Sequence, residues 1–286
     1  MNIQLVIIDP QIDFMDQPGS ALPVPGATED MKRLAAMIDR IPARKINRIH
    51  VTLDSHQAID VGHPGMWRGR NGEEPPGFTM ITADMIEAGI WTPVFDMSKP
   101  AALALPDGTL RTVKQYMIDY ARQLEAQGKY NLMVWPEHCL VGSLGYSVQP
   151  DLFAALNRWA KQKKATINFV AKGSNPYTEH YGALRAEVPL PSDPDTDLRS
   201  DLLEILRDAD MIIFAGEALS HCLRETITQI INELDPALVS KLYLLIDCTS
   251  SIGVTPDADF PALSAEWLKD VVAKGLNIIT STDFLA

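Results

Sequence analysis

The sequence has little of what marks secreted, membrane or nucleic-acid-binding proteins. Its 286 residues include three cysteines, an odd number too small for a disulfide framework. No apolar run approaches the roughly 18 residues that cross a bilayer, and the first residues lack the basic start of a secretion signal. The 25 basic residues form no cluster and 37 acidic residues outnumber them. We therefore expect a cytoplasmic protein with reduced cysteines and no nucleic-acid or membrane partner.

The remaining composition is that of an ordinary globular protein. Hydrophobic residues make up 46% of the chain and charged residues 22%, which excludes wholesale disorder and fibrous repeats. The length suits one large domain or two small ones. Because no repeat or convincing linker divides the chain, we predict a single domain over residues 1–286.

Short apolar runs rich in β-branched residues alternate with segments of helical period. The runs that we interpret as buried strands lie at residues 5–9, 48–54, 165–172, 211–216, 242–247 and 276–280, with a shorter candidate at 132–135. The helical segments lie at 29–39, 110–127, 151–162, 197–207, 220–234 and 265–274. Such alternation predicts an α/β protein with a parallel central sheet covered on both faces.

Residues 64–131 interrupt this alternation. The segment up to residue 110 is rich in Gly, Pro and Met and has no sustained period. Its aromatic residues Trp67, Phe78 and Trp91 favour a packed element, so we expect a lid or an oligomer contact. The alternative is a tolerated surface excursion, because the entropy of closing a loop grows slowly with its length.

Reactive side chains follow several of the predicted strands. Asp9 and Asp54 end the first two strands, Lys172 ends a third, and a fourth leads through Gly216 toward Cys222. Ligands of open parallel sheets bind beyond the carboxyl ends of the strands. An aspartate after one strand is usually a turn former. The coincidence of four such residues favours a catalytic edge.

Cys222 lies where a predicted helix begins, with Ser220 as the expected N-cap. Backbone N–H groups and the helix dipole stabilise a thiolate in a first helical turn. The same N–H groups can hold an oxyanion. The alternative is a buried inert cysteine, which is our interpretation of Cys139 and Cys248.

Asp54, His56, His63 and His138 form a second candidate set. Asp54 and His56 alternate at a strand end, so both can point the same way. Imidazoles with one carboxylate suit zinc, iron or manganese and leave open positions for water or substrate. The alternative is three unrelated surface or capping histidines.

Five motifs occur in the order found in nicotinamidases of the isochorismatase-like cysteine hydrolase superfamily. They are Ile8-Asp9-Pro10-Gln11-Ile12-Asp13-Phe14, Asp54-Ser55-His56, Trp135-Pro136-Glu137-His138-Cys139, Lys172-Gly173 and Ala218-Leu219-Ser220-His221-Cys222. The sequence resembles this family over nearly its whole length. The resemblance implies a three-layer α/β/α fold with a parallel central sheet.

The resemblance also implies a catalytic triad. Asp9 would take the proton of Cys222, Lys172 would stabilise the thiolate, and Cys222 would attack the amide carbon. The N–H groups of Ala218 and Cys222 would form the oxyanion hole. The family's cis peptide maps to the bond between Glu217 and Ala218, although Glu217 replaces an aliphatic residue of the family.

The resemblance also implies one divalent metal ion, with zinc expected and iron or manganese possible. Its ligands would be Asp54, His56, His63 and His138. In the family the metal binds the pyridine nitrogen, and residues corresponding to Phe14, Trp135 and Tyr181 line the substrate pocket.

The activity implied is hydrolysis of nicotinamide to nicotinate and ammonia through a cysteine thioester. Alternatives are a related amidohydrolase acting on another primary amide or an N-carbamoyl or ureido compound, and a non-catalytic metal-binding protein. The expected partners are a small amide substrate and further copies of the chain in a homo-oligomer.

Overall fold

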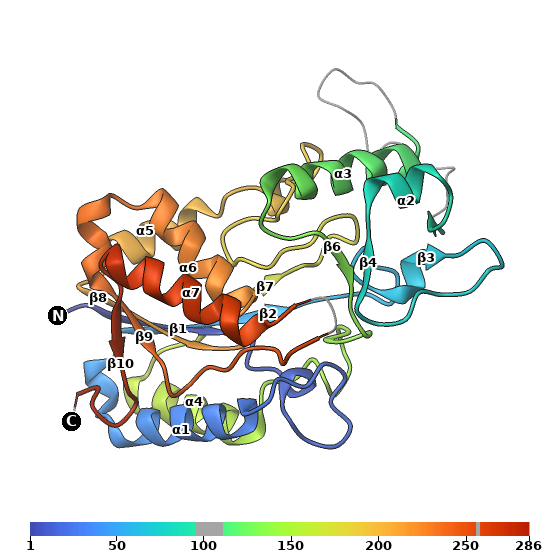
Figure 1. The fold of residues 1–286 in the computed structure, drawn as a ribbon. Coiled ribbons are helices and arrows are strands. Elements are labelled where there is room, and N and C mark those ends of the chain that lie inside the picture. The colour runs from blue at the N-terminus through green and yellow to red at the C-terminus, as the bar shows by residue number, and fades with distance from the viewer. Residues whose placement is uncertain (95–110, 256–257, 286) are drawn as a thin grey trace.

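The protein is built around a central sheet of six parallel strands. The computed structural model describes residues 1–94, 111–255 and 258–285. The strand order is β10–β9–β8–β1–β2–β7 (Figure 1). The strands are β1 (Ile3–Ile8), β2 (Arg48–Asp54), β7 (Asn168–Lys172), β8 (Met211–Gly216), β9 (Leu242–Leu245) and β10 (Asn277–Ile279). Every pairing within this sheet is parallel, as the alternation predicts.

Helices cover both faces of the sheet. Helices α1 (Ala27–Arg40) and α4 (Pro150–Lys163) lie on one face. Helices α5 (Ser200–Arg207), α6 (Cys222–Glu233) and α7 (Phe260–Ala273) lie on the other (Figure 1). The predicted three-layer α/β/α fold is therefore confirmed.

Hydrophobic patterning explains these layers. All six residues of β1 are buried, because the strand lies inside the sheet with helices on both faces. On α4 the buried residues Leu152, Ala155, Leu156 and Trp159 recur at the helical period and form one face. Burial of such a face against the sheet, rather than helix propensity alone, stabilises the helix.

The segment 64–131 forms its own small elements. These are β3 (Trp67–Arg68), β4 (Thr79–Ile81), α2 (Ala83–Glu87), β5 (Thr92–Pro93) and α3 (Val113–Gln127). The short apolar run that we expected as a further strand is β6 (Leu132–Val134), and it pairs antiparallel with β4 outside the central sheet. Residue 110, where the sequence predicts that α3 begins, lies outside the described residues. The helix begins after Thr112, which forms a capping box with Gln115.

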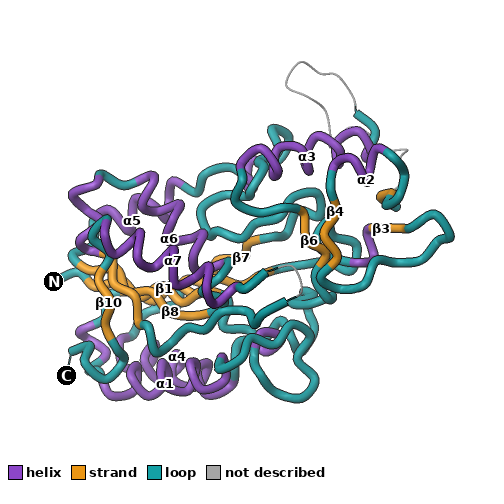
Figure 2. Tube along the Cα trace, viewed as in Figure 1, coloured by secondary structure: helices purple, strands orange, loops and turns teal. Residues whose placement is uncertain are grey.

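A second hydrophobic core holds this segment together. Trp67, Ile86, Met117 and Tyr120 belong to it and are fully buried. The segment lies beyond the carboxyl ends of the central strands (Figure 1), among the loops that surround this end of the sheet (Figure 2). Its role as a lid or an oligomer contact stays a prediction.

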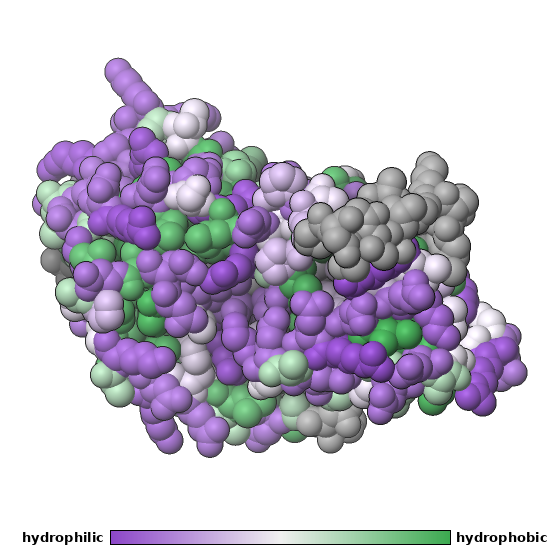
Figure 3. Space-filling model, turned by 90° about the horizontal axis from the view of Figure 1, so that it is seen from above, coloured by the Kyte–Doolittle hydropathy of each residue, from purple (hydrophilic) through white to green (hydrophobic). Residues whose placement is uncertain are grey.

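The outer surface is mainly hydrophilic on the face shown in Figure 3, where hydrophobic residues form separate patches. In the described part of the chain, no helix combines the length and the apolar character that crossing a bilayer requires.

Candidate active site

The carboxyl ends of four neighbouring strands, β8, β1, β2 and β7, bring four predicted site residues into contact. The Lys172 Nζ atom lies 2.9 Å from Asp9 Oδ2 and 2.9 Å from Asp54 Oδ1. It also lies 3.5 Å from Cys222 Sγ. All four side chains are buried. The edge of the sheet therefore holds an ion-paired lysine between two carboxylates and a thiol.

Neighbouring strand β2 fixes the orientation of Asp9. The Asp9 N–H donates to Thr52 Oγ1 at 3.0 Å, and the Thr52 hydroxyl donates to Asp9 Oδ1 at 2.5 Å. Asp9 has a φ of 41°, in the left-handed region that a residue other than glycine rarely adopts. Such backbone outliers persist where surrounding contacts hold them and are common at active sites.

Burial and charge set the ionisation of this cluster. Burial disfavours the ammonium of Lys172, but Asp54 and Asp9 outweigh this effect and hold its pKa well above the ordinary value. Burial also opposes ionisation of Asp54, yet His56 and Lys172 hold the pKa of Asp54 well below its usual range. The pKa of Asp9 is raised by burial, and Lys172 opposes that rise.

Cys222 is the first residue of α6, so its N–H points out of the helix and needs an acceptor outside it. Burial raises the pKa of the Cys222 thiol well above its ordinary value, against the opposing effect of Lys172. The surroundings therefore favour a neutral thiol, whereas the sequence predicts a thiolate at a helix N-terminus. The difference arises because the helix start is buried beside two carboxylates.

Ser220 is not the N-cap that the sequence predicts. The capping position is His221, and the Ser220 hydroxyl lies 2.9 Å from His221 Nδ1. The peptide bond between Glu217 and Ala218 is cis, as the resemblance implies. Gly216 is required at the end of β8, because a Cβ there would lie 2.1 Å from the carbonyl oxygen of Ile8.

The four predicted metal ligands also lie together. The ligand atoms of His56, His63 and His138 lie within 4.8 Å of one another. Asp54 Oδ2 lies 3.1 Å from His56 Nε2 and 3.5 Å from His138 Nε2. All four side chains are buried. Three imidazoles and a carboxylate are a donor set that suits a divalent transition metal.

Hydrogen bonds behind these imidazoles fit a metal site. His56 Nδ1 lies 3.1 Å from Asp60 Oδ2, and His63 Nδ1 lies 3.0 Å from the carbonyl oxygen of Gln57. Metal-binding histidines usually bond through the second ring nitrogen to a carboxylate or a carbonyl. Burial, with the neighbouring His56 and His138, lowers the pKa of His63 to about 2, so this imidazole is neutral and able to bind a metal. Sequence spacing did not identify Asp60.

Cys222 of the first cluster and Asp54, His56 and His138 of the second border one cavity with a volume of about 20 Å³. This space has room for about one water molecule and is far below the ~300–1,000 Å³ typical of small-ligand pockets, so a larger ligand would displace some of these side chains. The lining residues are Phe14, Leu22, Asp54, His56, Trp135, His138, Glu179, Tyr181, Ala218, His221, Cys222 and Ile252. The cavity walls thus include the three residues predicted to contact substrate, and Trp135 Nε1 donates to Tyr181 Oη at 3.2 Å.

Glu179 is a pocket residue that sequence analysis missed. It is buried, and its Oε1 has no hydrogen-bond partner among the described residues. Burial raises its pKa to about 8. The carboxyl packs over Gly62, where a Cβ would lie 2.0 Å from Oε1. Glu179 therefore places a further carboxyl oxygen at the cavity wall, against Gly62, the residue before the predicted ligand His63.

The segment 64–131 contacts two residues of the cavity wall, Glu179 and Trp135. Tyr120 on α3 accepts a hydrogen bond from the Glu179 N–H at 3.0 Å. The Phe78 ring packs edge-on against Trp135, with ring centroids 5.9 Å apart. Two pocket residues are thus held by this segment.

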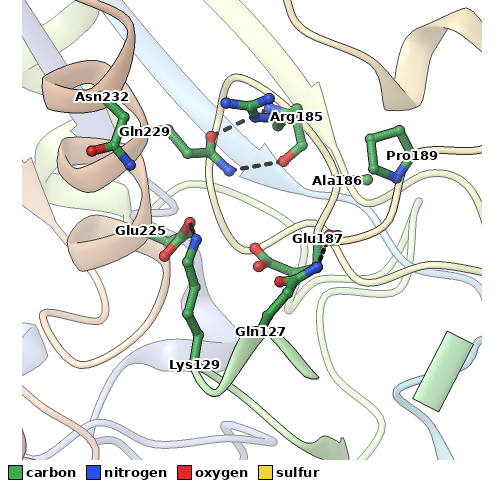
Figure 4. Close-up of a pocket in the computed structure, with 9 residues that line it drawn as sticks. All are labelled: Gln127, Lys129, Arg185, Ala186, Glu187, Pro189, Glu225, Gln229 and Asn232. Atoms are coloured by element: carbon green, nitrogen blue, oxygen red, sulfur yellow. Dashed lines mark hydrogen bonds and ion pairs between the residues drawn. The ribbon is translucent and has the colours of Figure 1, made fainter. Parts of the chain in front are cut away.

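A second and more open cavity lies between the end of α3, residues 185–189 and α6 (Figure 4). Lys129 Nζ lies 2.8 Å from Glu225 Oε1, one helical turn after Cys222. The Gln127 side chain donates to the carbonyl oxygen of Glu187 at 3.0 Å. These contacts join the segment 64–131 to α6 and to the loop after β7.

Comparison with protein-family models gives no match, and no curated protein matches the sequence. Several solved structures match over nearly the whole chain. The yeast nicotinamidase Pnc1p is 20% identical with a TM-score of 0.59, over 97% of this chain and 99% of that chain. A nicotinamidase–pyrazinamidase of Acinetobacter baumanii is 17% identical with a TM-score of 0.60, over 99% and 98%. A pyrazinamidase of Pyrococcus horikoshii in complex with zinc is 17% identical with a TM-score of 0.52, over 98% and 99%.

At these identities the comparisons establish a shared fold. The chain has the isochorismatase-like α/β fold found in nicotinamidases and pyrazinamidases.

Proposed function

We propose that the protein is a metal-assisted amidohydrolase that converts nicotinamide to nicotinate and ammonia through a thioester on Cys222. The observation that supports it most is one cavity lined by Cys222 together with Asp54, His56 and His138. Lys172 links Asp9 and Asp54 beside the Cys222 sulfur, and Asp54 contacts the histidine cluster. A nucleophile, a base and a metal-binding donor set would then act on one small molecule.

Asp9 is the proposed proton acceptor. As the Cys222 sulfur attacks the amide carbon, its proton passes to the Asp9 carboxylate. The neutral resting thiol fits a transfer of this proton during attack. Lys172 remains charged and stabilises the negative charge that moves between sulfur and carboxylate.

Backbone N–H groups of Ala218 and Cys222 would bind the oxygen of the tetrahedral intermediate. Collapse of this intermediate breaks the carbon–nitrogen bond, and Asp9 returns its proton to the leaving ammonia. Asp9 then takes a proton from the water that attacks the thioester. In the second collapse the carbon–sulfur bond breaks, Asp9 returns its proton to the Cys222 sulfur, and the carboxylic acid is released.

The residues that would hold the metal are Asp54, His56, His63 and His138, with the Glu179 carboxyl available at the cavity wall. A bound divalent ion supplies a Lewis acid that orients the substrate. We propose zinc, which suits nitrogen and oxygen donors and is present in the Pyrococcus horikoshii pyrazinamidase. Phe14 and Trp135 supply flat apolar walls for an aromatic ring.

Ammonia release from nicotinamide tests this function. Purified protein is loaded separately with zinc, iron and manganese, and ammonia is measured with nicotinamide, other primary amides and N-carbamoyl compounds. We expect release from nicotinamide by a metal-loaded form. If ammonia is released only from another compound in the panel, nicotinamide is not the substrate and the same mechanism acts on that compound. If no compound releases ammonia, the proposal that the protein is an amidohydrolase is wrong.

A further inference from the structure

Glu217 is a buried glutamate next to the proposed oxyanion hole. It directly precedes Ala218, and none of its surface is exposed. Its backbone N–H donates to the carbonyl oxygen of Ile8 at 2.8 Å, which fixes its main chain against β1. Its carboxyl Oε2 accepts from the Ser250 N–H at 3.1 Å, while Oε1 has no partner among the described hydrogen bonds.

The carboxylate of Asp30 on α1 faces Glu217. Asp30 already has two donors, because Ser250 Oγ donates to its Oδ2 at 2.6 Å and Arg33 pairs with its Oδ1. Burial and the adjacent Asp30 raise the pKa of Glu217 well above its ordinary value. Two neighbouring buried carboxyls do not both ionise readily. Burial and the adjacent Asp30 thus both favour the neutral form of Glu217.

Ser250 connects this carboxyl pair to the chain on both sides of Ala218. Its carbonyl oxygen accepts from the Leu219 N–H at 2.8 Å. Cys248, two residues earlier, accepts from the Gly216 N–H at 2.9 Å through its carbonyl oxygen. The start of α1 fits tightly here, since a Cβ at Gly26 would lie 2.8 Å from Ser250 Oγ. A change in the Glu217 side chain would thus disturb a closely packed contact.

We propose that Glu217 is a positioning residue that, through its buried hydrogen bond with the Ser250 N–H, fixes the direction of the Ala218 N–H in the oxyanion hole. The inference rests on the proposed function, because an oxyanion forms only if Cys222 attacks a carbonyl group. Displacement of a catalytic group by about 1 Å can reduce a rate by about 10²-fold. The effect should appear in kcat, since the oxyanion interaction is made in the transition state.

Two substitutions separate the hydrogen bond of Glu217 from its volume. Glu217→Gln keeps an oxygen for the Ser250 N–H, so we expect a kcat within about 3-fold of wild type. Glu217→Leu removes this bond, so we expect kcat to fall about 10- to 100-fold with little change in KM. Val271→Ala, a core change on α7, controls for general destabilisation and should leave kcat per folded molecule unchanged.

Amide hydrogen exchange of Leu219 provides a readout without turnover. We expect faster exchange in Glu217→Leu and wild-type exchange in Glu217→Gln. A wild-type kcat in Glu217→Leu, or equal losses in both variants, would overturn the proposal. If wild-type protein hydrolyses no amide, the proposed function fails and the oxyanion role fails with it. Altered exchange would then support only a structural link.

Discussion

The ammonium group of Lys172 lies 3.5 Å from the sulfur of Cys222. Both side chains are buried in the interior of the protein, away from water. A buried lysine without partners tends to lose its proton. Here the carboxylates of Asp9 and Asp54, each 2.9 Å from Nζ, keep the charge in place. A fixed cation beside the thiol is the central electrostatic feature of the site.

Replacing Lys172 with Met should affect both activity and stability. Removal of the cation leaves Asp9 and Asp54 buried without their shared partner, which we expect to cost about 3–5 kcal/mol of unfolding free energy. We also expect kcat/KM to fall by at least about 10³-fold, because the charge that develops during proton transfer is no longer stabilised. Lys161→Met, at an exposed position of α4, is the control. Urea unfolding and ammonia release measure the two effects, and wild-type kcat/KM in Lys172→Met would contradict the assignment.

Asp60 offers a test of the metal site that leaves all four proposed ligands in place. Its Oδ2 lies 3.1 Å from His56 Nδ1, and its Oδ1 accepts from the Gly62 N–H at 3.1 Å. Loss of such a carboxylate behind a metal-binding histidine typically weakens metal affinity about 10- to 100-fold. We expect this loss of zinc affinity in Asp60→Asn, measured by competition with a chelator.

The matched control is Asp39→Asn, because Asp39 pairs with Arg158 on the exposed surface. Its zinc affinity should equal that of wild type. Equal affinities of Asp60→Asn and wild type would count against a metal bound by His56.

Glu187 should make stability depend on pH. Burial, with the nearby Glu225, raises its pKa to about 8 from an ordinary value of 4.5. The folded protein therefore holds a proton between about pH 4.5 and 8 that the unfolded chain releases, so the stability contribution declines as pH rises through this window. We expect a loss on the order of 3 kcal/mol across the window.

Glu187→Gln removes this titration, so its unfolding free energy should fall less than that of wild type between pH 5 and 8. Glu204→Gln, at an exposed position of α5, should show the wild-type dependence. Parallel curves for wild type and Glu187→Gln in urea unfolding at a series of pH values would show that Glu187 ionises normally.

Lys129 should stabilise the contact between the segment 64–131 and α6 (Figure 4). The side chain of its partner Glu225 is 3% exposed, whereas that of Lys129 is 41% exposed, so water screens part of the interaction. We expect Lys129→Met to lower the unfolding free energy by about 1–2 kcal/mol, less than for a fully buried pair.

The control for this change is Lys32→Met, which breaks the exposed pair of Lys32 and Glu29 and should lower the unfolding free energy less than Lys129→Met. Thermal or urea unfolding compares the two variants. A loss in Lys129→Met no larger than in Lys32→Met would show that the pair does not stabilise the contact.

The central layers could be predicted from sequence because their signals are local. Strand β1 is a continuous apolar run, as expected for a strand covered on both faces, and Asp9 follows where that run ends. The parallel arrangement then brings strand ends to one edge, so the contact of Asp9, Asp54 and Lys172 follows from topology.

Other features depend on distant partners. The apolar run of β6 has the composition of a central strand, but its pairing with β4 depends on how the intervening loop folds. Glu179 lies in an irregular loop whose path is fixed by bonds from α3, including that to Tyr120. Ser220 has the residue type of an N-cap, yet its hydroxyl bonds to His221. None of these contacts leaves a periodic pattern in the sequence.

Trapping the acyl-enzyme tests the central claim most directly. Metal-loaded protein is incubated with nicotinamide and hydroxylamine, the products are analysed, and acid-quenched protein is mapped by mass spectrometry. We expect a nicotinoyl group on the peptide containing Cys222, formation of the hydroxamate from the thioester, and neither product in Cys222→Ala. Hydrolysis of nicotinamide by Cys222→Ala at the wild-type rate would contradict the account.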